Sequence, residues 1–100
     1  MTVLVAGSFR LPPERVAEAR AEMVRVIDAS LAEPGCCIYT YAEDVAEPGL
    51  FQVHEEWDSR AALEAHFATP HMKRWQIERE KLGFSDRRIS VYEIASVTPL

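Results

Sequence analysis

The sequence predicts an α+β domain in which one four-stranded antiparallel sheet carries helices on a single face. Strand-like and helix-like periodicities follow one another in the order β-α-β-β-α-β, and proline or glycine separates most of the segments. This order is the ferredoxin-like arrangement, with the second helix split in two. The predicted strands are residues 2–9, 36–42, 50–57 and about 87–95, and the predicted helices are residues 14–31, 60–68 and 70–82.

The predicted strands are apolar on both faces. In the first strand, Val3, Val5 and Phe9 point to one side, whereas Leu4 and Ala6 point to the other. Helices on one side cover only one face, and an exposed apolar patch larger than roughly 600 Å² is unusual on a monomer. The sequence therefore predicts a homodimer in which two sheets meet face to face. The second face is expected to accommodate part of a set that consists of Val3, Leu4, Ile38, Tyr39, Tyr92 and Ile94.

The helices are predicted from a 3.6-residue apolar period and from the residues at their ends. Thr69-Pro70 interrupts the second helical segment, because threonine favours the N-cap and proline the first helical position. Gly83 is expected just beyond the last helix. The apolar positions of the first helix are Val16, Ala19, Met23, Ile27 and Leu31.

Length and composition predict one small soluble domain over residues 1–100, with its core at about 2–95. The 100 residues are 48% hydrophobic and carry a net charge of −5, which argues against nucleic acid as a partner. The adjacent Cys36 and Cys37 are expected to be reduced thiols. No basic leader and no long apolar run is present, so a cytoplasmic protein without a membrane partner is expected.

A short stretch after residue 50 places polar side chains beside apolar ones, as in a ligand pocket. Glu55 is in line with the apolar residues of its strand, and His66 lies on the apolar side of its helix. His71 follows the proline that opens the next helix. A buried Glu55 needs a donor, so a structural pair with His66, His71 or an arginine is as reasonable as a catalytic role. A lone histidine on a helix, such as His66, is usually structural, and His71 is most simply a surface residue near the start of its helix.

Aromatic residues of the same region are expected either to fill the core or to line a slot for a planar substrate. The sequence does not distinguish these two roles. Tyr39 and Tyr41 share a face only if their strand is regular, and which sheet face lines the pocket is also open. The aromatic candidates for substrate binding, to which we add His71, are Phe51, Trp57, Phe67 and Trp75.

No cofactor motif is present, and no metal is expected. His66 and His71 are five residues apart with Pro70 between them, a spacing that is expected to splay the two rings. The sequence contains no CxxC or HExxH motif, and its four glycines are isolated, so neither a phosphate loop nor a flavin or nicotinamide fingerprint exists.

The run E-x-W-x-S-x-x-A-L-x-A-H-x-x-T-P-H-M-K, residues 55–73, resembles the antibiotic biosynthesis monooxygenase (ABM) family, in its small quinol-monooxygenase-like branch. An upstream E-x-G-C…Y, residues 33–39, adds to the resemblance, which covers nearly the whole chain. The resemblance implies a dimeric α/β barrel and oxygenation without flavin or metal, on a scaffold that supports varied chemistry.

The resemblance implies a monooxygenase that oxidises a small quinol-like or phenolic aromatic with dioxygen. Deprotonation makes such a substrate electron-rich enough to reduce dioxygen, so the protein has to supply a base and a dry planar slot. In this reading His66 is the base, Glu55 orients it, and Trp57 and Trp75 are the walls. The alternatives are a dimeric module that binds a small ligand without catalysis, and an isomerase of a small oxo compound.

One departure from the family narrows the chemistry. The chain contains no asparagine, so the Asn-Trp-His arrangement of the heme-degrading branch and the Asn-Trp pair of the polyketide oxygenases are both missing. Gln76 stands where a heme-binding histidine would be expected. Heme degradation is therefore not predicted, and oxidation of polyketides is less favoured than oxidation of small quinols.

Overall fold

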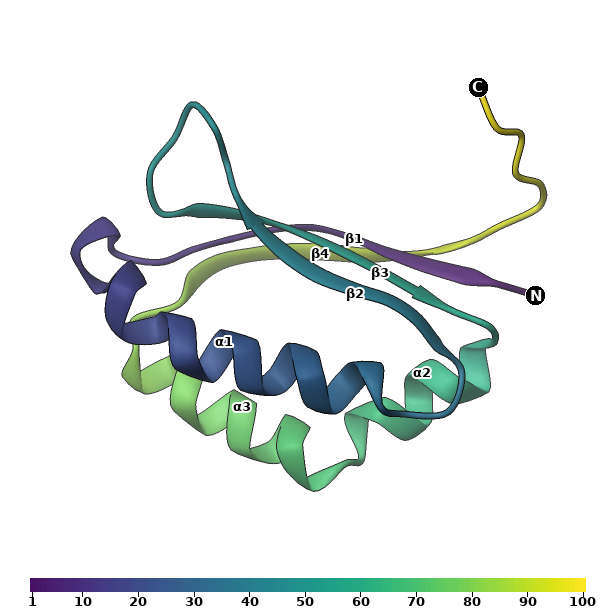
Figure 1. Ribbon diagram of the computed structural model, residues 1–100, viewed down its shortest axis with the longest axis horizontal. Helices are drawn as coiled ribbons and strands as arrows, with labels where there is room; N and C mark the ends of the chain where they lie inside the picture. The colour runs from purple at the N-terminus through teal and green to yellow at the C-terminus, as the bar shows by residue number, and fades with distance from the viewer.

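A computed structural model describes residues 1–100 and has the predicted element order (Figure 1). Two helices, α2 and α3, together form the second crossover, so the split predicted at Thr69-Pro70 is confirmed. The elements are β1 (Val3–Arg10), a 3₁₀ turn η1 (Pro13–Arg15), α1 (Val16–Leu31), β2 (Cys36–Glu43), β3 (Leu50–Trp57), α2 (Arg60–Phe67), α3 (Pro70–Lys81) and β4 (Ser85–Glu93).

The four strands form one antiparallel sheet in the order β2-β3-β1-β4. All of the helices lie on one side of this sheet, which confirms the ferredoxin-like fold (Figure 1). Val5 pairs with Glu55 on one neighbouring strand and with Val91 on the other, so these three residues form a row on the helix-facing side. The polar Glu55 is therefore built into the covered face of the sheet.

Local side-chain chemistry sets both the start of α2 and the break between α2 and α3. Ser59 caps α2 by accepting a hydrogen bond from the backbone N–H of Ala62, and Thr69 caps α3 by accepting one from Met72. The hydroxyl of Thr69 also donates to the carbonyl of His66, 2.8 Å away. The end of one helix is thus tied to the start of the next, and the chain bends there (Figure 1).

The buried side chains form two clusters. The larger cluster lies between α1, α3 and the sheet, and the smaller one lies near α2. The larger contains Phe9, Leu11, Ala19, Met23, Val26, Phe51, Val53, Met72, Trp75 and Leu82; the smaller contains Val3, Val5, Tyr39, Trp57 and Leu63. No helix in the chain has the length and apolar content that crossing a membrane requires.

Some details differ from the sequence prediction. Leu31 is exposed and Val26 is buried. The predicted apolar positions from Ala19 onward are four residues apart, whereas a helical turn has about 3.6 residues, so the later positions rotate away from the core. The last strand begins at Ser85, two residues before the predicted start. Of the residues from which the second sheet face is expected to draw, Val3 and Tyr39 face the helices instead.

Candidate active site

A cavity of about 290 Å³ lies between the sheet, α2 and α3. Residues of both core clusters line it, so the cavity lies where the two clusters meet. Its aromatic walls are Phe9, Tyr39, Tyr41, Phe67, Trp75 and Phe84. Its titratable or charged lining residues are Glu55, His66, Arg79, Asp86 and Arg87. A wider groove of about 630 Å³ beside α1 contains no histidine, so the smaller cavity is the better candidate for chemistry.

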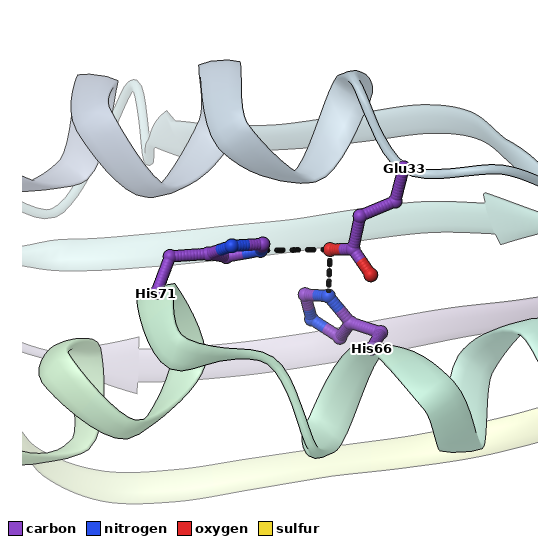
Figure 2. Close-up of side chains that lie close together, drawn as sticks. All are labelled: Glu33, His66 and His71. Atoms are coloured by element: carbon purple, nitrogen blue, oxygen red, sulfur yellow. Dashed lines mark hydrogen bonds and ion pairs between the residues drawn. The ribbon is translucent and has the colours of Figure 1, made fainter.

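A histidine–glutamate–histidine cluster lies at the α2–α3 break (Figure 2). One oxygen of Glu33, Oε2, is 2.6 Å from Nδ1 of His66 and 2.8 Å from Nε2 of His71. The His66 side chain is 1% exposed and the His71 side chain 23%, so the cluster connects a buried ring to a partly solvated one. The predicted pairing of His66 with Glu55 is wrong, because the carboxylate that contacts His66 is that of Glu33.

The turn after α1 brings Glu33 to this break. Gly35 has φ of +83°, a conformation that other residues rarely adopt. A Cβ atom at this position would lie 2.6 Å from Oδ1 of Asp58, so the turn also has no room for a side chain. The Glu-Pro-Gly sequence therefore ends the helix and directs the carboxylate toward α2 and α3.

The geometry fixes the tautomer of His66. An ionised Glu33 can only accept, so Nδ1 of His66 carries the proton and Nε2 keeps its lone pair. No group of the chain hydrogen-bonds Nε2, and the ring lines the cavity. Burial lowers the pKa of His66, although the hydrogen bond and the charge of Glu33 oppose this effect. His66 is therefore a neutral base at neutral pH.

Glu55 lies in the cavity wall as a second group that exchanges protons. Its oxygen accepts a hydrogen bond from Nε1 of Trp57 at 3.0 Å, and the residue is only 7% exposed. Burial raises its pKa to about 7, while the Trp57 hydrogen bond and the charge of Arg87 lower it. Glu55 is thus partly protonated near neutral pH, when it can donate as well as accept.

Two tyrosines of β2 face the cavity together. The strand is regular from Ile38 onward, so Tyr39 and Tyr41 share the helix-facing side, and their hydroxyl oxygens are 3.1 Å apart. Burial raises the pKa of Tyr39 well above its usual range and that of Tyr41 to about 12. Both stay neutral phenols in the cavity wall.

The structure separates the aromatic candidates into two groups. Phe67 and Trp75 line the cavity, as expected for substrate contacts. Trp57 and Phe51 do not: Trp57 is fully buried with its ring 4.7 Å from that of His66, and Phe51 stacks on Phe9 in the larger cluster. These two residues support the site from the core instead of facing a ligand.

His66 and His71 also form a potential metal site with Glu33. One ligand atom from each residue lies within 4.8 Å of the others, and two imidazoles with a carboxylate are a common ligand set for Zn²⁺ or Fe²⁺. The expectation that Pro70 splays the two rings is wrong. The chain bends at the break, so the spacing of a continuous helix does not apply.

Sequence reasoning assigned no role to three residues of the site. Glu33 belongs to the E-x-G-C motif, but nothing in its position predicts contact with two histidines. Arg79 is four residues after Trp75, so helical periodicity places both on one face of α3. Apart from its place in the last strand, nothing in the sequence indicates that Arg87 lines the cavity.

Comparison with known proteins identifies the family. The model of the family described as "Antibiotic biosynthesis monooxygenase" matches residues 2–77. The chain belongs to the ABM family. The match covers the entire histidine–glutamate–histidine cluster and most of the cavity wall, but not β4.

Similar proteins agree with this assignment. An uncharacterized protein of Synechocystis, sll1783, is 34% identical over 98% of this chain and 67% of its own length. The Escherichia coli (strain K12) protein named "Probable quinol monooxygenase YgiN" is 37% identical over 60 residues, which cover 52% of this chain and 58% of that protein. The crystal structure of a candidate antibiotic biosynthesis monooxygenase from Deinococcus radiodurans superposes with a TM-score of 0.90 at 27% identity, covering 100% of this chain and 98% of that one.

Proposed function

We propose that this ABM protein is a cofactor-independent monooxygenase that oxidises a small quinol-like or phenolic aromatic with dioxygen. One observation carries the proposal: Glu33 holds a neutral His66 in the wall of an aromatic cavity, with the ring nitrogen Nε2 free. A base in this position can deprotonate a phenol that stacks against the aromatic walls. The name of the relative YgiN, a probable quinol monooxygenase, supports the same substrate class.

The reaction balances without an added reductant. Nε2 of His66 removes the proton of a substrate hydroxyl, and the resulting phenolate transfers electrons to dioxygen. One oxygen atom forms a bond to the ring, and the other leaves as water. A quinol plus dioxygen thus gives a hydroxyquinone plus water, and all four electrons come from the substrate.

The other residues of the site stabilise charge and move the proton. The imidazolium formed at His66 lies 2.6 Å from the Glu33 carboxylate, which stabilises it. His71, on the other side of the same oxygen and partly solvated, connects this carboxylate to water. A protonated Glu55, and whichever of the paired Tyr39 and Tyr41 hydroxyls accepts from the other, can donate to the oxygen atoms that become negative.

A second candidate function uses the same cluster differently. If Glu33, His66 and His71 held a divalent metal, the protein would be a metal-dependent enzyme, because the donor atoms are close enough to share one ion. The two functions predict opposite responses to metal: the first is active without it, and the second requires it.

Oxygen uptake by protein freed of metal and flavin tests the proposal. We expect substrate-dependent uptake, above autoxidation, with a panel of small quinols, and one atom of ¹⁸O from labelled dioxygen in the product. Activity that appears only after Fe²⁺ or Zn²⁺ is added would favour the second candidate. Quinol binding without uptake would contradict oxygenation and leave a binding module or an isomerase.

A further inference from the structure

Two arginines line the same cavity and form no direct ion pair within the chain. Arg79 comes from α3 and Arg87 from β4, and neither lies within 4.0 Å of a carboxylate. Five other arginines of the chain do have such partners, whereas Arg20 and Arg88 have none but lie outside the cavity. These paired arginines are Arg10, Arg15, Arg25, Arg60 and Arg74.

The unpaired state of Arg79 is unfavourable in the free protein. Its side chain is partly buried beside the cavity. Burial lowers the pKa of Arg79, and the nearby charge of Arg87 lowers it further. A guanidinium that loses water and lies near a second guanidinium is stabilised by an anion. The charge of Glu80 opposes this lowering of the pKa, but no carboxylate of the chain forms an ion pair with Arg79.

The other charged groups of the cavity do not neutralise the arginines. Asp86 lies 3.9 Å from Arg10. Glu55 accepts from Trp57, and burial holds much of it in the protonated form at neutral pH. His66 is neutral. The cavity is therefore positively charged in a chain whose net charge is −5.

The arginines also lie away from the base. Arg79 is nine residues after Pro70 along α3, a rise of roughly 13 Å, whereas His66 lies just before that helix begins. We infer that the natural substrate is an aromatic carboxylate, whose acidic group binds Arg79 and Arg87 while its phenolic hydroxyl meets His66. A planar, singly charged carboxylate matches the guanidinium fork. The claim that this ligand is also oxidised rests on the proposed function.

Anaerobic binding tests the inference independently of turnover. The probes are 4-hydroxyphenylpropanoate, its neutral amide and 4-hydroxyphenylethyl phosphate, titrated by calorimetry. We expect the carboxylate to bind at least about tenfold more tightly than the amide, a factor of the size that one charged contact supplies. Equal affinity for acid and amide would overturn the inference, and so would binding of the phosphate in preference to the carboxylate.

Matched variants localise the effect. Arg79→Gln and Arg87→Gln should each remove most of the preference for the acid while leaving affinity for the amide unchanged. Arg88→Gln is the control, because Arg88 neighbours Arg87 on β4 but does not line the cavity. Thermal unfolding verifies that each variant is folded. A preference for the acid that survives in both Arg79→Gln and Arg87→Gln would overturn the inference.

The outcome separates this inference from the proposed function. Acid binding that depends on Arg79 without any oxygen uptake would support the anion site and contradict oxygenation. Uptake with neutral quinols, unchanged by Arg79→Gln and with no preference for acids, would contradict the anion site and support oxygenation.

Discussion

At the scale of single residues, the function of the site depends on which carboxylate contacts His66. Glu55 looked like the partner from sequence, because it is near in the chain and in line with buried residues. The structure assigns that contact to Glu33, 33 residues away. Glu55 instead accepts a hydrogen bond from Trp57. The two carboxylates therefore have separable effects, one on the base and one on stability.

Glu33→Gln should lower kcat by about 10²-fold or more, since it removes the charge that orients and stabilises the His66 imidazolium. Glu33 raises the pKa of His66, so the loss of the Glu33 charge should lower that pKa further. The acid limb of kcat/KM, which lies below pH 6.5 in the wild type, should therefore move to lower pH. A pH–rate profile checks both. Glu18→Gln, which alters the exposed Arg15–Glu18 pair, is the control. An acid limb that stays in place in Glu33→Gln would contradict this role.

Glu55→Gln should change the pH dependence of stability. The folded protein holds the Glu55 proton more tightly than the unfolded chain, so this contribution is complete below pH 4.5 and is lost as pH rises through about 7. The variant should therefore gain stability relative to wild type by roughly 3 kcal/mol between pH 4.5 and pH 8.5. Urea unfolding at both pH values measures the difference, with the exposed Glu64→Gln as control. No gain at high pH would refute the burial argument.

At the scale of elements, the α2–α3 break creates the site. The Thr69 cap and Pro70 start α3 just after α2 ends, which brings His66 and His71 onto one oxygen atom. A continuous helix of the same sequence would separate the two rings. In the proposed function, the break therefore positions the base besides contributing local stability.

Thr69→Ala should cost about 1 kcal/mol of stability through the lost cap and should also lower kcat to roughly a tenth or less, because His66 loses its anchor. Ser59→Ala removes the matching cap of α2 at a similar cost in stability. Chemical denaturation and steady-state kinetics on both variants separate the two effects. If both variants lose activity equally, the break has no special role in positioning.

Elements were predictable from the sequence, but the contacts between them were not. The local sequence carries the signals that define the elements, namely the apolar period, the capping residues, Pro70 and Gly83. The predicted bounds of helices and strands therefore lie within about two residues of those observed. The contact of Glu33 with His66 and His71 depends on how a loop packs against a distant helix break. No local pattern encodes that packing.

At the scale of the whole molecule, the uncovered sheet face is mixed and less apolar than the sequence predicted. Ile38, Glu56, Leu4 and Tyr92 form one row across it. Val3 and Tyr39, whose direction the sequence left open, face the helices. The row nevertheless leaves Ile38 and Tyr92 exposed, at 36% and 51%. We therefore retain the prediction of a homodimer formed through this face.

Light scattering should give a mass of about twice 11.3 kDa at micromolar concentration. Tyr92→Lys should shift the protein toward monomer, because it adds a charge to the proposed contact. Val45→Lys, on a loop where the valine is fully exposed, should have no effect. A monomeric wild type, or a Tyr92→Lys variant that remains dimeric, would contradict a dimer through this face.

The central claim is that His66 is the base, and kcat/KM of His66→Ala for quinol oxidation tests it most directly. His54→Ala is the matched control, because His54 is an exposed histidine outside the cavity. We predict a loss of about 10²- to 10⁴-fold in His66→Ala, partial recovery on adding imidazole, and unchanged kinetics in His54→Ala. Glu33 keeps His71 as a partner, so the variant should fold, which circular dichroism verifies. A folded His66→Ala with wild-type kcat/KM would contradict the account.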